Sequence, residues 1–279
     1  MLALIMTLLA CSTDSVVSPS TPISTPQVAN IRTAGEVLTS TYVIFAPGNQ
    51  RHLVPLACFD TSSRISGRGS TCMDHIGLEA EIQLQDGRVV SVGAPTTFEC
   101  TGTEETTSAL MTPENQPIGS GTQFGIWPSL EAAQWINRID TPVQPAQLRP
   151  LIEAASASPM VQNLPEEFRD DIQLRTVLEL DLEGDGVEDS LVEAYILSTD
   201  GSHEIRSTLF VGGIRPMRVT APNLAPATTT SVVGAARTTS EGAWLILLES
   251  KTANEKTWTV IQRTDRGFIA RGSWSCPSE

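Results

Sequence analysis

The sequence has 279 residues, and 18 Lys and Arg against 32 Asp and Glu give a formal net charge of −14. A chain of this length with 40% hydrophobic residues can bury a core in one large or two small domains, which excludes wholesale disorder. The acidic balance argues against a nucleic-acid partner, because nucleic-acid-binding proteins concentrate Lys and Arg on the surface that contacts the phosphate backbone. The only lysines are Lys251 and Lys256, so the chain has no polybasic patch for a membrane surface.

The chain begins with a short apolar run, MLALIMTLLA, over residues 1–10. Ten residues are too few to cross a hydrocarbon core of roughly 30 Å as a helix. The run has the length of the apolar region of a secretory signal peptide. We therefore predict export of the chain, with residues 1–10 as the signal peptide.

Residues 8–11, Leu-Leu-Ala-Cys, resemble the bacterial lipobox. The resemblance implies that Cys11 is acylated with a diacylglycerol thioether and an N-acyl chain such as palmitate, and becomes the mature N-terminus. Ser12 after the cysteine implies the outer membrane of a Gram-negative envelope. The Ser-, Thr- and Pro-rich residues that follow predict a semi-extended tether, so residues 11–32 are anchor and tether. The alternative is that Cys11 is a small apolar residue of a signal peptide cleaved elsewhere.

Four further cysteines remain, an even number that favours disulfides in an exported chain. A zinc site is the rival interpretation, but no CxxC pair or closely spaced histidine pair lies nearby. Three pairings are open, and we prefer Cys58 with Cys72 and Cys100 with Cys276.

The rest of the chain predicts strands in two groups with a helical insert between them. Alternating residues around Asp86-Gly87 indicate a β-hairpin within 78–92. Ser129 is expected to cap a helix over LEAAQWIN, and further short helices are expected at 150–157 and 165–171. Other strands are expected at 37–46, 52–57, 173–181, 190–199, 203–213, 242–250, 256–264 and 267–274.

These patterns predict an α+β, mainly β fold. Residues 33–125 form an N-terminal β-rich region, 126–172 the helical insert and 173–279 a C-terminal antiparallel β meander.

The segment 181–189, DLEGDGVED, carries carboxylates at relative positions 1, 3, 5 and 9 and glycine at position 6. Calcium takes six to eight oxygen ligands, which alternate residues of a tight loop can supply. The segment resembles the calcium loops of FG-GAP, dockerin and thrombospondin type 3 repeats. Position 12 is Val192 rather than a bidentate Glu, so the pattern is not that of an EF-hand. We predict a structural Ca²⁺ site; the alternative is an acidic turn without a metal. The expected ligands are Asp181, Glu183, Asp185 and Asp189 through their side chains and Val187 through its carbonyl.

No catalytic residue is predicted. The sequence contains no GxSxG, HExxH, P-loop or strand-following GxGxxG motif. In Asp74-His75 and His203-Glu204, a histidine is next in sequence to an acid. Neighbouring side chains of a strand point to opposite faces, so neither pair is preassembled for proton transfer. Ser120, between two glycines, is expected to lie in a flexible turn.

We expect the five tryptophans to be buried in the core. The alternative is that exposed tryptophans form a carbohydrate-binding platform. Trp244 and Trp258 are expected on neighbouring strands, where their rings could stack.

Together these features predict a calcium-stapled lipoprotein of the bacterial cell envelope, anchored through Cys11. Its expected role is non-enzymatic binding, adhesion or envelope structure, with an unidentified protein or glycan partner. An envelope hydrolase acting on glycan or peptide, and an accessory subunit of a surface assembly, remain the alternatives.

Overall fold

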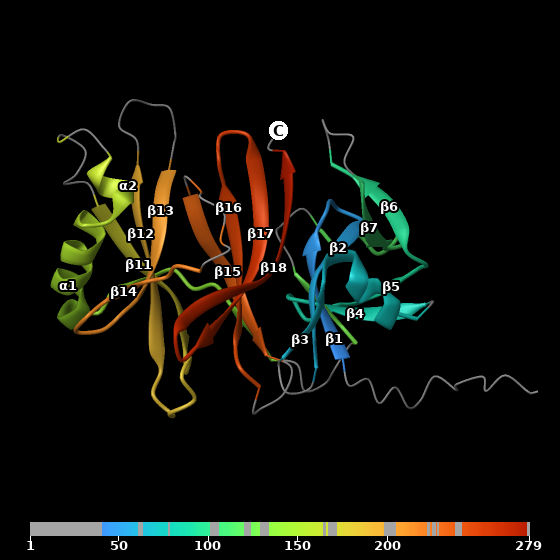
Figure 1. The fold of residues 1–279 in the computed structure, drawn as a ribbon, viewed down its shortest axis with the longest axis horizontal. Helices are drawn as coiled ribbons and strands as arrows, with labels where there is room; N and C mark the ends of the chain where they lie inside the picture. The colour runs from blue at the N-terminus through green and yellow to red at the C-terminus, as the bar shows by residue number, and fades with distance from the viewer. Residues whose placement is uncertain are drawn as a thin grey trace, which may run out of the picture. The chain divides into compact units, whose positions relative to one another are not determined.

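The computed structural model describes residues 41–60, 64–77, 79–100, 106–119, 124–128, 134–163, 166, 172–197, 205–221, 224, 227, 229–237 and 242–277. Residues Thr39–Glu279 form one compact unit. Its described residues form mainly antiparallel strands, with two α-helices and the 3₁₀ helix Gly69–His75, so the predicted α+β, mainly β fold class is confirmed (Figure 1). The predicted signal peptide, anchor and tether, residues 1–32, lie outside the described residues.

The first sheet, sheet 1, has eight strands in the order β5-β4-β8-β1-β2-β7-β6, with β3 paired to β2. The predicted hairpin at Asp86-Gly87 is confirmed: β4 and β5 pair around it, and Gly87 has a φ of 85° that favours glycine. The strands are β1 Thr41–Pro47, β2 His52–Asp60, β3 Ile65–Arg68, β4 Ala80–Leu84, β5 Val89–Val92, β6 Thr96–Glu99, β7 Thr106–Met111 and β8 Gly125–Trp127.

The central strands β1 and β2 are buried on both faces, which explains their nearly continuous apolar sequence. In β1, Val43 and Phe45 pack into a core beneath the 3₁₀ helix η1 (Gly69–His75). Ile44 and Ala46 point the other way, into a core shared with β16 and β17. Successive residues therefore serve two cores, as the two-residue period of a strand requires.

The C-terminal part contains two five-stranded sheets rather than the single predicted meander. Sheet 2 has the order β10-β11-β12-β13-β14, and sheet 3 the order β18-β17-β16-β15-β9. Sheet 2 comprises β10 Thr141–Pro142, β11 Ile172–Leu180, β12 Asp189–Leu197, β13 Ile205–Val211 and β14 Met217–Arg218. Sheet 3 comprises β9 Gln134–Asn137, β15 Thr229–Arg237, β16 Leu245–Lys251, β17 Glu255–Thr264 and β18 Gly267–Pro277.

Sheet 3 is the middle layer of this unit (Figure 1). One of its faces shares an apolar core with sheet 1, and the other shares a core with sheet 2. The outer face of sheet 2 is covered by α1 (Pro145–Ser156), whose Leu151 and Ala155 pack against Val192 and Phe210. Because sheet 3 is covered on both sides, β16 and β17 contain long buried runs.

The helix predicted over LEAAQWIN is wrong in its described part, because Gln134–Asn137 forms β9. Trp135 packs into the core toward sheet 1, while its neighbour Ile136 packs into the core toward sheet 2. Adjacent apolar side chains that face opposite cores need the period of a strand, not that of a helix.

The helix expected at 150–157 exists as α1 but begins five residues earlier, at Pro145. A second helix, α2, covers Pro159–Gln162. Of the helix expected at 165–171, only residue 166 is described.

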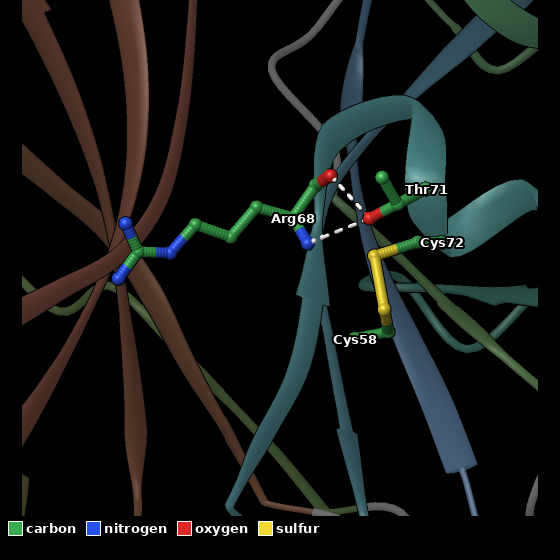
Figure 2. Close-up of a disulfide and its surroundings, with 4 residues drawn as sticks. All are labelled: Cys58, Arg68, Thr71 and Cys72. Carbon is green, nitrogen blue, oxygen red and sulfur yellow. Dashed lines mark hydrogen bonds between the residues drawn. A yellow bond between two sulfur atoms is a disulfide. The ribbon is translucent and has the colours of Figure 1, made fainter.

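Both preferred disulfides are present. Cys58–Cys72 ties β2 to η1 with a Cα–Cα distance of 5.5 Å, and Cys100–Cys276 ties the end of β6 to β18 with 5.6 Å. Figure 2 shows the first bridge beside the Thr71 hydroxyl, which donates to the Arg68 carbonyl (2.8 Å) and accepts from its N–H (3.1 Å). The two bridges differ in reach, since one is local and the other fastens sheet 1 to sheet 3.

Candidate functional site

The predicted calcium loop joins β11 to β12 at an exposed end of sheet 2. Its two glycines, Gly184 and Gly186, have φ values of 76° and 83°, in the left-handed region that favours glycine. They allow the chain to fold back on itself within a few residues. We call residues 181–189 the acidic loop.

Asp181 organises the acidic loop through its carboxylate. Its oxygens accept hydrogen bonds from the backbone N–H groups of Gly184 (2.6 Å), Asp185 (3.1 Å) and Gly186 (2.8 Å). The N–H of Gly186, followed by those of Gly184 and Asp185, holds the pKa of Asp181 below its usual value. This carboxylate is thus held ionised by the loop that it shapes.

The other carboxylates of the acidic loop have different partners. Asp185 accepts a hydrogen bond from the N–H of Val187 (2.8 Å), and Asp189 accepts one from the N–H of Leu182 (3.1 Å). Glu183 instead reaches across to sheet 3, where its Oε1 lies 3.0 Å from Nη2 of Arg263. The side chain at the third ligand position is therefore engaged by a cation from another sheet.

The pKa of Asp189 reflects both its burial and the negative charge of the acidic loop. Burial raises its pKa above the usual value, and the negative charges of Glu183, Asp185 and Asp181 raise it further. The four carboxylates are close enough to repel one another. Within the described residues, however, no group of three or more His, Cys, Asp or Glu side chains is arranged to hold a metal ion. The donor set suits Ca²⁺ in chemical type, since carboxylate and carbonyl oxygens are its preferred ligands.

A hollow of about 690 Å³ opens beside the acidic loop. Its lining includes residues of the loop and two arginines, Arg237 and Arg263, that no sequence pattern indicated. Arg237 lies over the ring of Trp244 (4.6 Å to the centroid) and Arg263 over that of Phe268 (5.4 Å). Each guanidinium thus lies within cation–π distance of an aromatic ring.

A second cluster of charges lies farther along β12, between sheets 2 and 3. Glu193 is only 3% exposed, and its Oε2 lies 2.5 Å from Nη2 of Arg138. Its Oε1 accepts a hydrogen bond from the hydroxyl of Ser231 in sheet 3 (3.0 Å). Arg138 also pairs with Asp140 (2.9 Å), whose pKa is lowered first by that hydrogen bond. We call Glu193, Arg138, Asp140 and Ser231 the buried ion cluster after its buried member Glu193; the side chain of Asp140 is half-exposed.

A second hollow, of about 600 Å³, lies where sheet 1 meets the edge of sheet 3. Its walls come from the first residues of β7, the turn before β17 and the end of β18. The disulfide Cys100–Cys276 borders it, and we call it the seam hollow. No sequence pattern indicates it, because its residues lie in four separate segments of the chain.

The histidines and tryptophans fall into separate places. The ring of His52 lies against that of Phe98 (centroids 5.0 Å apart, planes tilted by 36°), and burial, followed by the charge of Arg51, lowers the pKa of His52. His75 ends η1, whereas His203 and Ser120 lie outside the described residues. In the described part of the chain, neither His52 nor His75 has an ion pair with a carboxylate.

The core interpretation of the tryptophans is confirmed for Trp244 and Trp258, which are 7% and 5% exposed. Their expected mutual stacking is wrong, because Trp258 stacks on Trp274 of β18 with a centroid distance of 4.8 Å. Trp244 instead belongs to the core between sheets 2 and 3.

Comparison of the chain with protein-family models, with curated proteins and with solved structures finds no match. Among the described residues, no helix combines the length and apolar character needed to cross a membrane.

Proposed function

We propose that this chain is a lipid-anchored binding protein of the bacterial cell envelope, held in the outer membrane through Cys11, that captures a partner without changing it chemically. The observation that carries the proposal is the cysteine inventory. Of five cysteines in the sequence, four are consumed by Cys58–Cys72 and Cys100–Cys276. The one left over is the cysteine of the lipobox-like sequence.

The disulfide pairing supports the envelope location and the lipid anchor. Structural disulfides persist in oxidising compartments such as the periplasm and the cell surface and are rare in the cytosol. Cys11 is thereby left available for a thioether bond to lipid. Three acyl chains, at ~0.8 kcal/mol per buried methylene, would make release from the bilayer negligible.

We also propose that the acidic loop binds a structural Ca²⁺ ion. Asp181, Glu183, Asp185 and Asp189 would supply side-chain oxygens, and Val187 its carbonyl. Burial contributes most to the raised pKa of Asp189, and repulsion from the neighbouring carboxylates raises it further. That repulsion supports the proposal, because a divalent cation would relieve it. The ion would staple β11 to β12 and take no part in a reaction, and Glu183 would have to exchange Arg263 for the ion.

The anchoring proposal is tested by membrane fractionation of cells that express the wild type and Cys11→Ala. We expect the wild type in the detergent-extracted outer-membrane fraction, labelled by metabolically supplied palmitate. We expect the variant to lose the label and the membrane association together. Ser12→Asp is the matched control, because it should keep the label and shift the protein to the inner membrane. Membrane-bound Cys11→Ala would overturn the proposal.

A further inference from the structure

The seam hollow offers hydrogen-bonding groups with almost no charge. Among the described residues, its lining includes four hydroxyl side chains and one carboxamide, with Glu255 as the only charged residue. The hydroxyls and the carboxamide are those of Thr106, Thr107, Ser273, Ser275 and Asn254. The nearest lysine in sequence, Lys256, is turned to Glu249 (2.8 Å) and to the ring of Trp258 (4.8 Å). A phosphate or carboxylate ligand would therefore find no cation in this lining to pair with.

One aromatic side chain borders the hollow, and it is firmly held. The ring of Trp274 stacks on Trp258 with an interplanar angle of 13°, and it meets Phe98 edge to face at 5.8 Å. Trp274 is half-buried, so part of the indole contacts solvent at the hollow. An amphipathic ring of this kind suits a ligand that has both polar groups and apolar C–H surface.

The walls of the hollow are fixed before any ligand arrives. The disulfide Cys100–Cys276 joins the two sheets at its edge. In the turn before β17, the N–H of Thr252 donates to the Glu255 carbonyl (2.8 Å), and the N–H of Asn254 donates to the Thr252 hydroxyl (3.3 Å). Side chains on a cross-linked, hydrogen-bonded frame lose little freedom on binding, which favours affinity.

We propose that the seam hollow binds a neutral, hydroxyl-rich ligand, namely a short stretch of an uncharged glycan. Hydroxyl and amide groups can exchange hydrogen bonds with sugar hydroxyls, and the Glu255 carboxylate can accept from them. The volume of about 600 Å³ falls within the roughly 300–1,000 Å³ of small-molecule sites. This inference rests on the proposed binding role and names the class of ligand for it.

A peptide that adds a strand along β18, on the side where no described strand pairs with it, is disfavoured by two features of β18. The carbonyl of Ser275 is already contacted by Sγ of Cys100 at 3.8 Å. Pro277, two residues on, has no N–H to donate to an added strand. Both features interrupt the regular ladder of backbone hydrogen bonds that strand addition needs. The ligand must therefore be recognised by side chains.

The test is calorimetric titration of the full-length protein in a detergent without a sugar headgroup. The probes are maltotetraose, cellotetraose and the tetramer of N-acetylglucosamine, with a neutral Ser- and Thr-containing tetrapeptide as the competing class. We expect at least one oligosaccharide to bind with a dissociation constant below ~1 mM. No binding by any oligosaccharide at ~10 mM, or binding of the peptide instead, would overturn the proposal.

Variants locate the site. Asn254→Ala and Ser273→Ala, both at exposed positions, should each weaken binding by about fivefold through loss of a hydrogen bond. Thr97→Val, at an exposed position of neighbouring β6 outside the hollow, is the matched control and should change it by less than about twofold. Equal affinity in all three variants would overturn the assignment to this hollow.

The state of the bound sugar separates this inference from the proposed function. Recovery of the oligosaccharide intact after prolonged incubation supports both. Recovery of shortened products, with binding still sensitive to Asn254→Ala, would sustain the glycan site and overturn the non-enzymatic role. Release of Cys11→Ala from membranes tests the anchor independently of either result.

Discussion

The hairpin β11–β12 carries two acidic regions that differ in how their charge is compensated. At its tip, the exposed acidic loop relies on backbone N–H groups and one outside arginine. Four residues into β12, the buried Glu193 is compensated by Arg138 and by the hydroxyl of Ser231. Dipoles suffice where water screens the charge, whereas a buried carboxylate needs a cation within contact distance. The loop is therefore the region left with room for an added cation, and the buried cluster carries its own.

The largest expected effect concerns the buried ion cluster. Glu193→Gln removes the buried negative partner of Arg138, whereas the half-exposed Asp140 still pairs with that guanidinium (2.9 Å). Breaking a fully buried ion pair costs about 3–5 kcal/mol, so with this remaining partner we expect a loss of about 2–3 kcal/mol. Urea unfolding of the variant should show a free energy of unfolding lower by that amount.

Glu179→Gln is the matched control for this prediction. Glu179 lies on β11 of the same hairpin and is exposed, so its loss should change the free energy of unfolding by less than about 0.5 kcal/mol. If the two variants were equally stable, the contrast between buried and exposed carboxylates on this hairpin would collapse.

A smaller effect is expected where the acidic loop meets sheet 3. Arg263→Gln removes the cation that engages Glu183 and competes with an ion for that side chain. Because the pair is largely exposed on the Glu183 side, its worth is about 1 kcal/mol at most. Calcium affinity should rise up to about fivefold in calorimetric titration. Weaker calcium binding by the variant would contradict the competition between Arg263 and the ion.

The smallest effect is a divergence of two pKa values within the acidic loop. In ¹³C NMR titrations without calcium, Asp181 should titrate below its usual 3.8 and Asp189 above it. The stabilising contribution of Asp181 is then complete above pH 3.8 and is lost as the pH falls through its lowered pKa. Ionised Asp189 opposes folding: its cost grows as the pH rises from 3.8 through its raised pKa, and persists above it. Coincident titration midpoints would refute this difference.

Local patterns in the sequence predicted much of the fold. Asp86-Gly87 specifies its hairpin because the turn needs a positive φ. The even cysteine count predicted two disulfides, and the pairing preferred among three is the one present. The helix prediction around Trp135 and Ile136 was wrong because adjacent apolar residues fit either a helix or a strand buried on both faces. Which of these applies depends on sheets formed by distant segments.

Long-range contacts account for what the sequence did not reveal about the candidate sites. Glu193 looks like an exposed residue of an alternating strand, and only the packing of sheet 3 over that face buries it. The seam hollow depends on β7 and β18 lying together, and the Cys100–Cys276 pairing was the one sequence signal pointing there. The spacing of acids in 181–189 predicted the loop, but not that Arg263 would engage Glu183.

The central claim is that the acidic loop binds a structural Ca²⁺ ion. Its most direct test is a calcium titration of the chain beginning at Ser12, followed by thermal unfolding. The wild type and Glu188→Gln should both gain melting temperature as calcium rises, because Glu188 is not among the proposed ligands. Asp185→Asn, which removes the same single charge at a ligand position, should gain none. No rise in the wild type at ~10 mM Ca²⁺, well above the range of extracellular modules, would contradict the claim and make the acidic loop a turn held by its own hydrogen bonds.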